Sequence, residues 1–394
     1  MRRHLCTAAI IVISMVIAPS GALSDPPPGY YDSVDETSSE TLRQTLHEVI
    51  DDHQGYPYTS GGTDTWDILE AADEDPNNSS NILDVYKNES YVKFGGGEGA
   101  YNREHSWPRS FGFPDEGSLN YPHNDCHHLF LCNVTYNGYR GSRPFDTCNE
   151  DCFERVTREN NGQGGGSGVY PGNSNWFSGD DGPYGTWETW IGRKGDVARA
   201  QFYMDLRYEG GTHGGTGAAE PDLILTDDRA LIAASATGNN EPVAYMGLAS
   251  VLYEWHLEDP VDDVERARND AVYSYQGNRN PFIDHPEWVT LLTAVDVPPA
   301  QAVHARLRQN YPNPFNPATK IVFEVDRPGA VSLSIFTIAG RSVVTLLDAE
   351  VSAGRHEISW DGRDALGKAM SSGSYLYRLD DGDVAITKRL LLLK

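Results

Sequence analysis

The chain has 394 residues, a mean hydropathy of −0.50 and a formal net charge of −26. This length exceeds that of a typical single domain and predicts two domains. The acidic balance excludes a general nucleic-acid coat protein, because such proteins bind phosphate groups through an excess of Lys and Arg. It leaves room for an enzyme whose cleft is locally positive or carries a bound cation.

The first 24 residues have the pattern of a secretory signal peptide. Met1–His4 is positively charged, the run from Leu5 to Ala18 is almost wholly apolar, and small residues follow at positions 20–24. The apolar run is too short for a convincing membrane span, and no second run long enough to cross a bilayer follows. We therefore expect a secreted or cell-surface protein of bacterial type.

Four cysteines remain after the signal peptide, and all lie within one short segment. In an exported chain an even number of cysteines predicts disulfides, here two, with three possible pairings. A structural zinc site is the alternative, but the spacing is not a paired C-x-x-C pattern. The four disulfide candidates are Cys126, Cys132, Cys148 and Cys152.

Residues 25–295 predict a mainly helical α+β domain. Apolar residues recur at helical spacing in several segments, while two short segments have the alternation and composition of strands. A Gly-rich polar stretch at 160–175 predicts a loop. The predicted helices are 40–53, 65–72, 196–208, 246–256 and 262–273, and the predicted strands are 82–86 and 91–94.

The pattern changes near Val297. Residues 296–306 are linker-like, and from 307 to 394 short segments alternate apolar with polar residues between glycines. Evenly spaced short strands predict a small all-β sandwich as the second domain. The predicted strands are 320–325, 331–336, 356–360 and 375–379.

The stretch from Asn102 to Pro108 places the carboxylate of Glu104 beside the imidazole of His105, and an amide follows at Asn137. A histidine titrates near neutral pH, so His105 is a natural general base. One carboxylate and one amide oxygen suffice for a Mg²⁺-class cation, which keeps several waters. Such a cation acts as a Lewis acid on a phosphodiester. Neighbouring strand residues point to opposite faces, so we expect a bend or a bridging phosphate at this point.

Three arginines and a His-rich stretch accompany this group. Arg140 and Arg143 can present guanidinium forks to phosphate oxygens. Arg109 is a further candidate for substrate contact, although ordinary surface pairing explains it equally well. The His-rich stretch is expected to orient the site by packing and hydrogen bonding rather than to bind the cation directly. It contributes Asp125, His127 and His128.

Residues 102–112 resemble the central motif of the bacterial endonuclease I family, and residues 125–130 and 136–145 resemble its second half. The segments 195–200 and 276–284 are also similar to that family. The motifs come in the family's order across about residues 35–295. The resemblance implies a secreted or periplasmic nuclease with a ββα-metal (His-Me finger) core.

The resemblance also implies roles at individual positions. Glu104 and Asn137 would bind the metal, His105 would activate water, and Arg140 would contact the cleaved phosphate. The metal would be Mg²⁺, with Ca²⁺ or Mn²⁺ as alternatives. The substrate would be DNA, often RNA too, cut with little sequence preference to leave 5′-phosphates. The chain departs from the family at Leu131, where proline is common. The ligand positions are kept, so this departure suggests a local disulfide variation.

Residues 307–319, 373–379 and 387–390 resemble the FlgD-like domains that sort exported bacterial proteins for type IX secretion. The resemblance implies that the second domain engages the secretion machinery, followed by its removal or by surface attachment. A plain accessory β-sandwich is the alternative.

The chain is expected to be a monomer. Other interpretations of the function of the first domain stay open. It could be a non-catalytic module that binds nucleic acid or a surface, or a metal phosphodiesterase for small substrates. Four aromatic residues could stack bases, but packing inside the fold is the favoured interpretation. These residues are Trp176, Tyr184, Trp187 and Trp190.

Overall fold

The computed structural model describes most of the chain. The described residues are 26–148, 152–166, 168–296, 305–307, 310, 312–313, 315–325, 328–337, 342–365, 367–380 and 385–392. The predicted signal peptide (1–24) and most of the predicted linker (296–306) lie outside them. The chain divides into two compact units between Leu292 and Thr293. This division falls close to the domain end predicted at residue 295.

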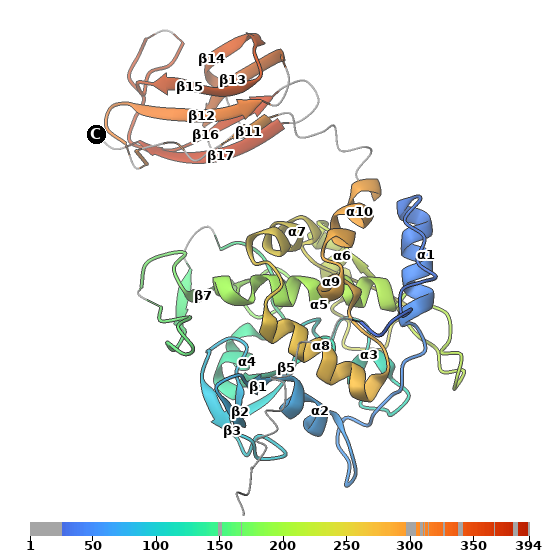
Figure 1. The fold of residues 1–394 in the computed structure, drawn as a ribbon. Helices are drawn as coiled ribbons and strands as arrows, with labels where there is room; N and C mark the ends of the chain where they lie inside the picture. The colour runs from blue at the N-terminus through green and yellow to red at the C-terminus, as the bar shows by residue number, and fades with distance from the viewer. Residues whose placement is uncertain are drawn as a thin grey trace, which may run out of the picture. The chain divides into compact units, whose positions relative to one another are not determined.

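Helix α5 (Lys194–Arg207) lies at the centre of the first unit (Figure 1). Nearly all of its residues are buried, as expected for a helix surrounded by other elements. Helices α1 (Ser39–Ile50), α7 (Ala249–Glu258) and α9 (Pro281–Asp284) pack against it. Through this burial on all sides, α5 anchors the main hydrophobic core.

Several of the remaining helices begin or end at capping residues. Helix α2 (Thr65–Ala72) starts at Asp64, whose side chain accepts a hydrogen bond from the Trp66 N–H. Helix α8 (Asp263–Gln276) ends at Gly277, which has the positive φ of 78° that favours glycine. The others are α3 (Tyr121–Asn124), α4 (Val134–Arg140), η1 (Ile191–Arg193), α6 (Arg229–Ser235) and α10 (Glu287–Asp296).

The strands of the first unit form small separate sheets. The orders are β1-β2-β3, β4-β5, β6-β7-β8 and β10-β9, and only the last pair is parallel. The strands are β1 (Glu74–Asp75), β2 (Asn78–Leu83), β3 (Ser90–Val92), β4 (Tyr101–His105), β5 (Leu129–Asn133), β6 (Phe153–Val156), β7 (Ser174–Ser178), β8 (Thr186–Glu188), β9 (Asp222–Leu225) and β10 (Val243–Met246).

The predicted α+β class is confirmed. The five predicted helices correspond to α1, α2, α5, α7 and α8, with small shifts at their ends. The strand predicted at 82–86 lies instead at Asn78–Leu83, because polar residues at its start pair with β1 and β3. Within the described residues no helix is both long and apolar enough to cross a bilayer.

The second unit consists of two antiparallel sheets, ordered β11-β12-β15 and β14-β13-β16-β17. Inward-facing alternate residues, such as Ile321, Phe323 and Val325 of β12, form its own core with Trp360. This arrangement confirms an all-β second domain. Its strands are β11 (Ala305–Leu307), β12 (Thr319–Val325), β13 (Gly329–Thr337), β14 (Ser342–Val351), β15 (Gly354–Trp360), β16 (Gly373–Asp380) and β17 (Ala385–Leu392).

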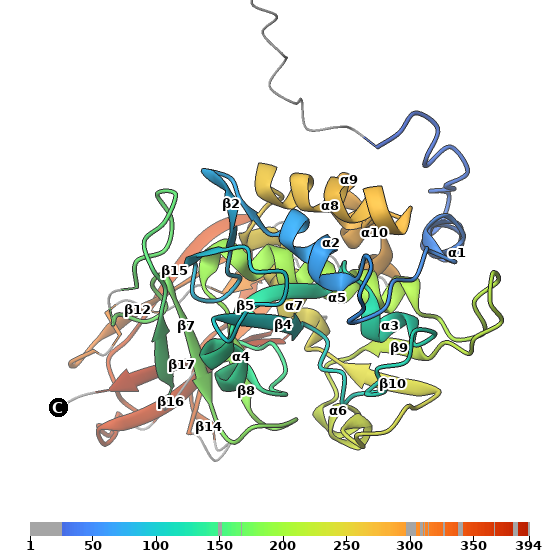
Figure 2. The same cartoon turned by 90° about the horizontal axis from the view of Figure 1, so that it is seen from below.

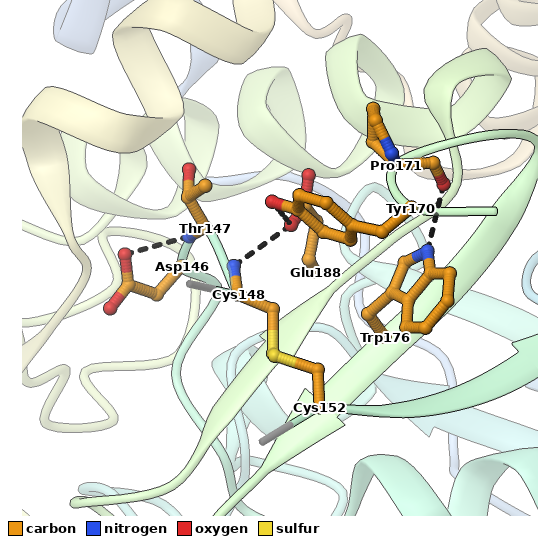
Figure 3. Close-up of a disulfide and its surroundings, with 8 residues drawn as sticks. All are labelled: Asp146, Thr147, Cys148, Cys152, Tyr170, Pro171, Trp176 and Glu188. Carbon is orange, nitrogen blue, oxygen red and sulfur yellow. Dashed lines mark hydrogen bonds between the residues drawn. A yellow bond between two sulfur atoms is a disulfide. The ribbon is translucent and has the colours of Figure 1, made fainter. Parts of the chain in front are cut away.

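The prediction of two disulfides is wrong for one pair. Cys148 and Cys152 are joined, and Figure 3 shows their bridge beside Glu188, whose carboxylate accepts a hydrogen bond from the Cys148 N–H at 2.8 Å. Cys126 and Cys132 are instead buried free thiols. They belong to different hydrophobic clusters, so their side chains pack into separate parts of the core. Burial raises the pKa of both thiols well above its usual value.

Candidate functional site

The site is built on β4, β5 and α4. Strands β4 and β5 are antiparallel, with Glu104 opposite Phe130 and His105 opposite Leu129. Helix α4 follows β5 at once, because the Asn133 side chain accepts hydrogen bonds from the first N–H groups of that helix. Figure 2 shows α4 beside β4. These three elements have the ββα order that the resemblance implies.

A cleft of about 500 Å³ opens over these elements. It brings together residues that are 30 or more positions apart in the sequence, as the predicted chemistry requires. His105 is the last residue of β4, where regular alternation ends, and both it and Glu104 line the cleft. Five of the predicted site residues line it: Glu104, His105, Arg109, Asn137 and Arg140.

His105 is held by its surroundings as a neutral base. Its Nε2 lies 2.9 Å from the carbonyl oxygen of His123, which can only accept a hydrogen bond. Nε2 therefore carries the proton and Nδ1 is the basic nitrogen. Burial, together with His128 and His123 nearby, lowers the pKa of His105 well below 6.5. The imidazole is thus unprotonated at neutral pH, as a general base must be.

Glu104 is 3% exposed and faces two partners through the same oxygen. Tyr86 donates a hydrogen bond to Oε1 at 2.9 Å, and Arg140 Nε lies 3.2 Å from that atom. This leaves Oε2 as the oxygen available to a cation. Burial raises the pKa of Glu104 to about 7, against the opposing effects of Arg140 and Tyr86.

Asn137 is oriented by hydrogen bonds to its nitrogen. Its Nδ2 donates to Oδ1 of Asn102 at 2.8 Å and approaches the carbonyl oxygen of Arg103 at 3.4 Å. The amide oxygen of Asn137 is therefore the atom left for another ligand. Asn102 thus acts as a positioning residue. The sequence analysis did not identify this role, although Asn102 begins the stretch that contains Glu104 and His105.

The three predicted arginines have different surroundings. Arg140 is almost fully buried, and its guanidinium donates to the carbonyl oxygens of His105 and Ser106. Arg109 lies at the cleft with its side chain 47% exposed and pairs with Glu116 at 3.0 Å. Arg143 does not line the cleft. It donates instead to the carbonyl oxygens of Tyr139 and Gly179 and thereby ties the last turn of α4 to the loop after β7.

The predicted positioning residues Asp125, His127 and His128 lie in two different surroundings. The Asp125 carboxylate is fully buried and accepts hydrogen bonds from Tyr203, Tyr208 and Gln276 in the core. His127 packs against Tyr203, with the ring centroids 4.6 Å apart. Of this group only the His128 ring lies against the His105 ring, with their centroids 5.4 Å apart. His128 therefore helps to position His105, whereas Asp125 and His127 hold the core together.

One wall of the cleft contains residues that the sequence analysis did not identify. The Arg103 guanidinium carbon lies 3.4 Å from the centroid of the Tyr58 ring and 4.2 Å from that of Trp66. Both aromatic residues lie far upstream of the motif. No sequence pattern marks them, because the chain returns to the site through tertiary packing.

The donor set fits a hard divalent cation. Within the described ranges, no group of three or more His, Cys, Asp and Glu side chains could hold a metal ion. The cleft instead offers one carboxylate oxygen of Glu104 and the free amide oxygen of Asn137. Such oxygen donors suit Mg²⁺ or Ca²⁺, whose remaining ligands can be water.

The tryptophans downstream of the site belong to the fold. Trp176, Trp187 and Trp190 are at most 8% exposed, whereas Tyr184 is 74% exposed. The indole N–H of Trp190 donates to the carbonyl oxygen of Val85 at 2.9 Å. The favoured interpretation of packing is therefore confirmed for the three tryptophans.

Comparisons with known proteins identify the family of the first unit and a domain in the second. The profile of endonuclease I matches residues 38–287, and that of the FlgD Ig-like domain matches residues 313–381. The extracellular ribonuclease of Bacillus subtilis (strain 168) is 39% identical over 262 residues, which is 66% of this chain and 76% of that protein. That of Bacillus amyloliquefaciens is 38% identical over 278 residues, which is 70% of this chain and 80% of that protein. A solved FlgD structure from Xanthomonas campestris has 25% identity and a TM-score of 0.17, and covers 22% of this chain and 66% of that one.

The endonuclease I match spans the cleft, the ββα elements and most of the first unit. It covers more than half of the chain, and both ribonucleases align over more than two thirds of their length. The chain therefore belongs to the endonuclease I family and is a nucleic-acid hydrolase.

Proposed function

We propose that this protein is a secreted, metal-dependent endonuclease that hydrolyses phosphodiester bonds of DNA and RNA with little sequence preference. The observation that carries the proposal is the presence of Glu104, His105 and Asn137 in one cleft. Membership of the endonuclease I family supports it. The two relatives, both named extracellular ribonucleases, support export and the inclusion of RNA.

His105 removes a proton from the attacking water at Nδ1, while the His123 carbonyl keeps Nε2 protonated. Glu104 Oε2 and Asn137 Oδ1 would hold the cation, which is Mg²⁺ with Ca²⁺ or Mn²⁺ as alternatives. When bound, the cation supplies Lewis acidity at the phosphate and the leaving oxygen. Cleavage on the 3′-oxygen side of the phosphorus leaves a 5′-phosphate.

The arginines at the cleft have complementary roles in this proposal. Arg109 is exposed and can bind a non-bridging phosphate oxygen. Arg140 holds the Glu104 carboxylate and the backbone on either side of the strand end. A contact between Arg140 and the cleaved phosphate stays a prediction, as does a contact between Arg143 and the substrate.

The test is nicking of supercoiled plasmid and cleavage of single-stranded RNA by purified protein with Mg²⁺. Wild-type protein should cut, excess EDTA should abolish cutting, and His105→Ala should cut at least a hundredfold more slowly. His285→Ala, at a half-buried histidine of the same unit that does not line the cleft, serves as the matched control. Full activity of His105→Ala would refute the role of His105. Cleavage of a chromogenic diester without cleavage of polynucleotides would favour a small-substrate phosphodiesterase.

We also propose that the second unit engages a bacterial secretion machinery of type IX. The FlgD Ig-like match over residues 313–381 supports an appended, separately folded domain. Deleting residues 305–394 should then retain the nuclease inside a producing cell that has this machinery. Equal export of the shortened chain would refute the proposal.

A further inference from the structure

An exposed aromatic surface lies where α4 meets the β6–β7 pair. It contains one residue of α4, two of β6 and one of β7. We call it the Arg155 surface, and it consists of Tyr139, Phe153, Arg155 and Phe177. The hydrolytic chemistry proposed above uses none of these four side chains.

The four side chains form a continuous stack. Phe153 and Phe177 face each other across the β6–β7 pair, with their ring centroids 5.5 Å apart. Tyr139 stacks on Phe177 at 5.7 Å with an interplanar angle of 26°. The Arg155 guanidinium carbon lies 3.6 Å from the centroid of the Tyr139 ring and 4.8 Å from that of Phe177. Trp187 lies behind Phe177 and anchors the stack in the core.

The outer members of this stack are open to solvent. Phe153 is 62% exposed and Tyr139 is 36% exposed, in contrast to the buried tryptophans of the same sheet. Arg155 forms no ion pair with the described carboxylates and donates only to the carbonyl oxygen of Glu154. The Glu154 carboxylate is used elsewhere, by Ser174 and Gly168. An exposed ring beside a cation without a carboxylate partner is unusual on a chain of net charge −26.

The Arg155 surface is continuous with the cleft through α4. Gly138 and Arg140, the neighbours of Tyr139, line the cleft, as do Gly141 and Ser142. Figure 2 shows α4 between β4, which carries the catalytic groups, and β7. A substrate strand that leaves the cleft over α4 therefore meets these rings next.

Aromatic faces and arginine are the groups that bind unpaired nucleotides, because every base has a face that can stack. Bases in a duplex are already stacked and cannot present their faces. We propose that the Arg155 surface binds unpaired nucleotides of a single-stranded substrate, next to the bond that is cleaved. This inference rests on the proposed function and gives the enzyme a preference for single strands.

Binding is measured on the full chain carrying His105→Ala, in EDTA so that nothing is cut. The probes are fluorescein-labelled single strands of about twelve nucleotides, one DNA and one RNA, and a DNA duplex of the same length. Phe153→Ala and Arg155→Gln should each weaken binding of both single strands by about tenfold and leave duplex binding within about twofold. Phe153→Trp should retain binding, because it keeps a stacking face. Leu257→Ala and Arg266→Gln, exposed positions on α7 and α8, are the matched controls.

Turnover with Mg²⁺ separates this inference from the proposed function. In the wild-type background, Phe153→Ala should lower kcat/KM for the single strand and leave that for a dinucleotide unchanged, because a dinucleotide does not reach β6. If neither the wild type nor any variant cleaves, but the binding differences remain, only the proposed function is refuted. If Phe153→Ala and Arg155→Gln bind the single strands as well as the control variants do, the inference is overturned. It is also overturned if these variants lose as much affinity for the duplex as for the single strands. A change in sedimentation without a change in binding would identify the surface as a contact with a second copy and also overturn it.

Discussion

At the scale of single residues, the site depends on which atom of each polar side chain is already occupied. The His123 carbonyl occupies Nε2 of His105, and Asn102 occupies Nδ2 of Asn137. Tyr86 and Arg140 occupy one oxygen of Glu104. Each partner leaves the reactive atom of its residue for water or a cation. Groups that orient ligands in this way affect metal affinity nearly as strongly as the ligands themselves.

Asn102→Ala should raise the Mg²⁺ concentration needed for half-maximal nicking by about tenfold to a hundredfold. The reason is that the Asn137 amide then loses the acceptor that fixes its orientation. The rate at saturating Mg²⁺ should change little. The measurement is plasmid nicking across a Mg²⁺ titration, with Asn239→Ala, at an exposed loop, as control. An unchanged titration curve would show that Asn102 does not position Asn137.

Buried histidines make the stability of the fold depend on pH. Burial lowers the pKa of His53 to about 3 and that of both His127 and His128 to about 4, although Asp125 opposes the shift. At these three histidines the unfolded chain therefore binds more protons than the folded one below pH 6.5. Their contribution to the free energy of unfolding is fully present above pH 6.5 and should be lost as the pH drops from 6.5 to about 4.

Urea unfolding at a series of pH values checks this expectation. His127→Gln keeps a donor for the Asn278 carbonyl and should reduce the slope by up to about 1.4 kcal/mol per pH unit. His285→Gln, at a half-buried position away from these three histidines, is the control. An equal slope in wild-type protein and in His127→Gln would contradict the assignment.

At the scale of elements, the β4–β5–α4 unit is fixed by contacts at both of its ends. The Asn133 side chain begins α4, and Arg140 at the end of α4 bonds back to the β4 backbone after Glu104. Downstream of α4, Cys148 and Cys152 are joined by a disulfide near Glu188 (Figure 3). The other two cysteines support the same region as packed thiols.

Thiol titration should find no reactive group in the native mature protein and two after unfolding without reductant. Cys126 and Cys132 are both buried, and burial raises the pKa of each thiol, so neither forms the reactive thiolate while folded. Reduced and unfolded protein, which should give four, is the control. Finding no thiol after unfolding would show that Cys126 and Cys132 form a second disulfide.

At the scale of the whole molecule, two units have separate hydrophobic cores. One surrounds α5 and the other lies between the two sheets of the second unit. The cleft residues all belong to the first unit. Nuclease chemistry therefore has no need of the second unit.

A chain ending at residue 296 should fold and cut plasmid with a kcat/KM within about twofold of the full chain. The reason is that the first unit contains the whole cleft and its own core. Nicking assays and thermal unfolding of both chains check this. A second shortened chain that ends at residue 276, and so lacks α9 and α10, should fail to fold, because α9 packs on α5. Loss of activity in the folded longer form would contradict the expectation.

The sequence by itself determined the features that local chemistry encodes. The periodicity of apolar residues located α1, α2 and α8, and alternation located β12 and β15. The motif around Glu104 and His105, with Asn137, predicted three residues that line one cleft, because the residues around them resemble the motif of a known family. The change of pattern near Val297 separated the two units.

Only the tertiary structure decided how these residues are used. It placed Tyr58 and Trp66 on the cleft wall and turned Arg143 away from it. It also left Cys126 and Cys132 unpaired in separate clusters and brought both Phe153 and Tyr139 against Phe177. The physical reason is that spacing along a chain fixes which face of an element a residue occupies. Which faces meet depends on contacts between segments far apart in sequence, and no local pattern records them.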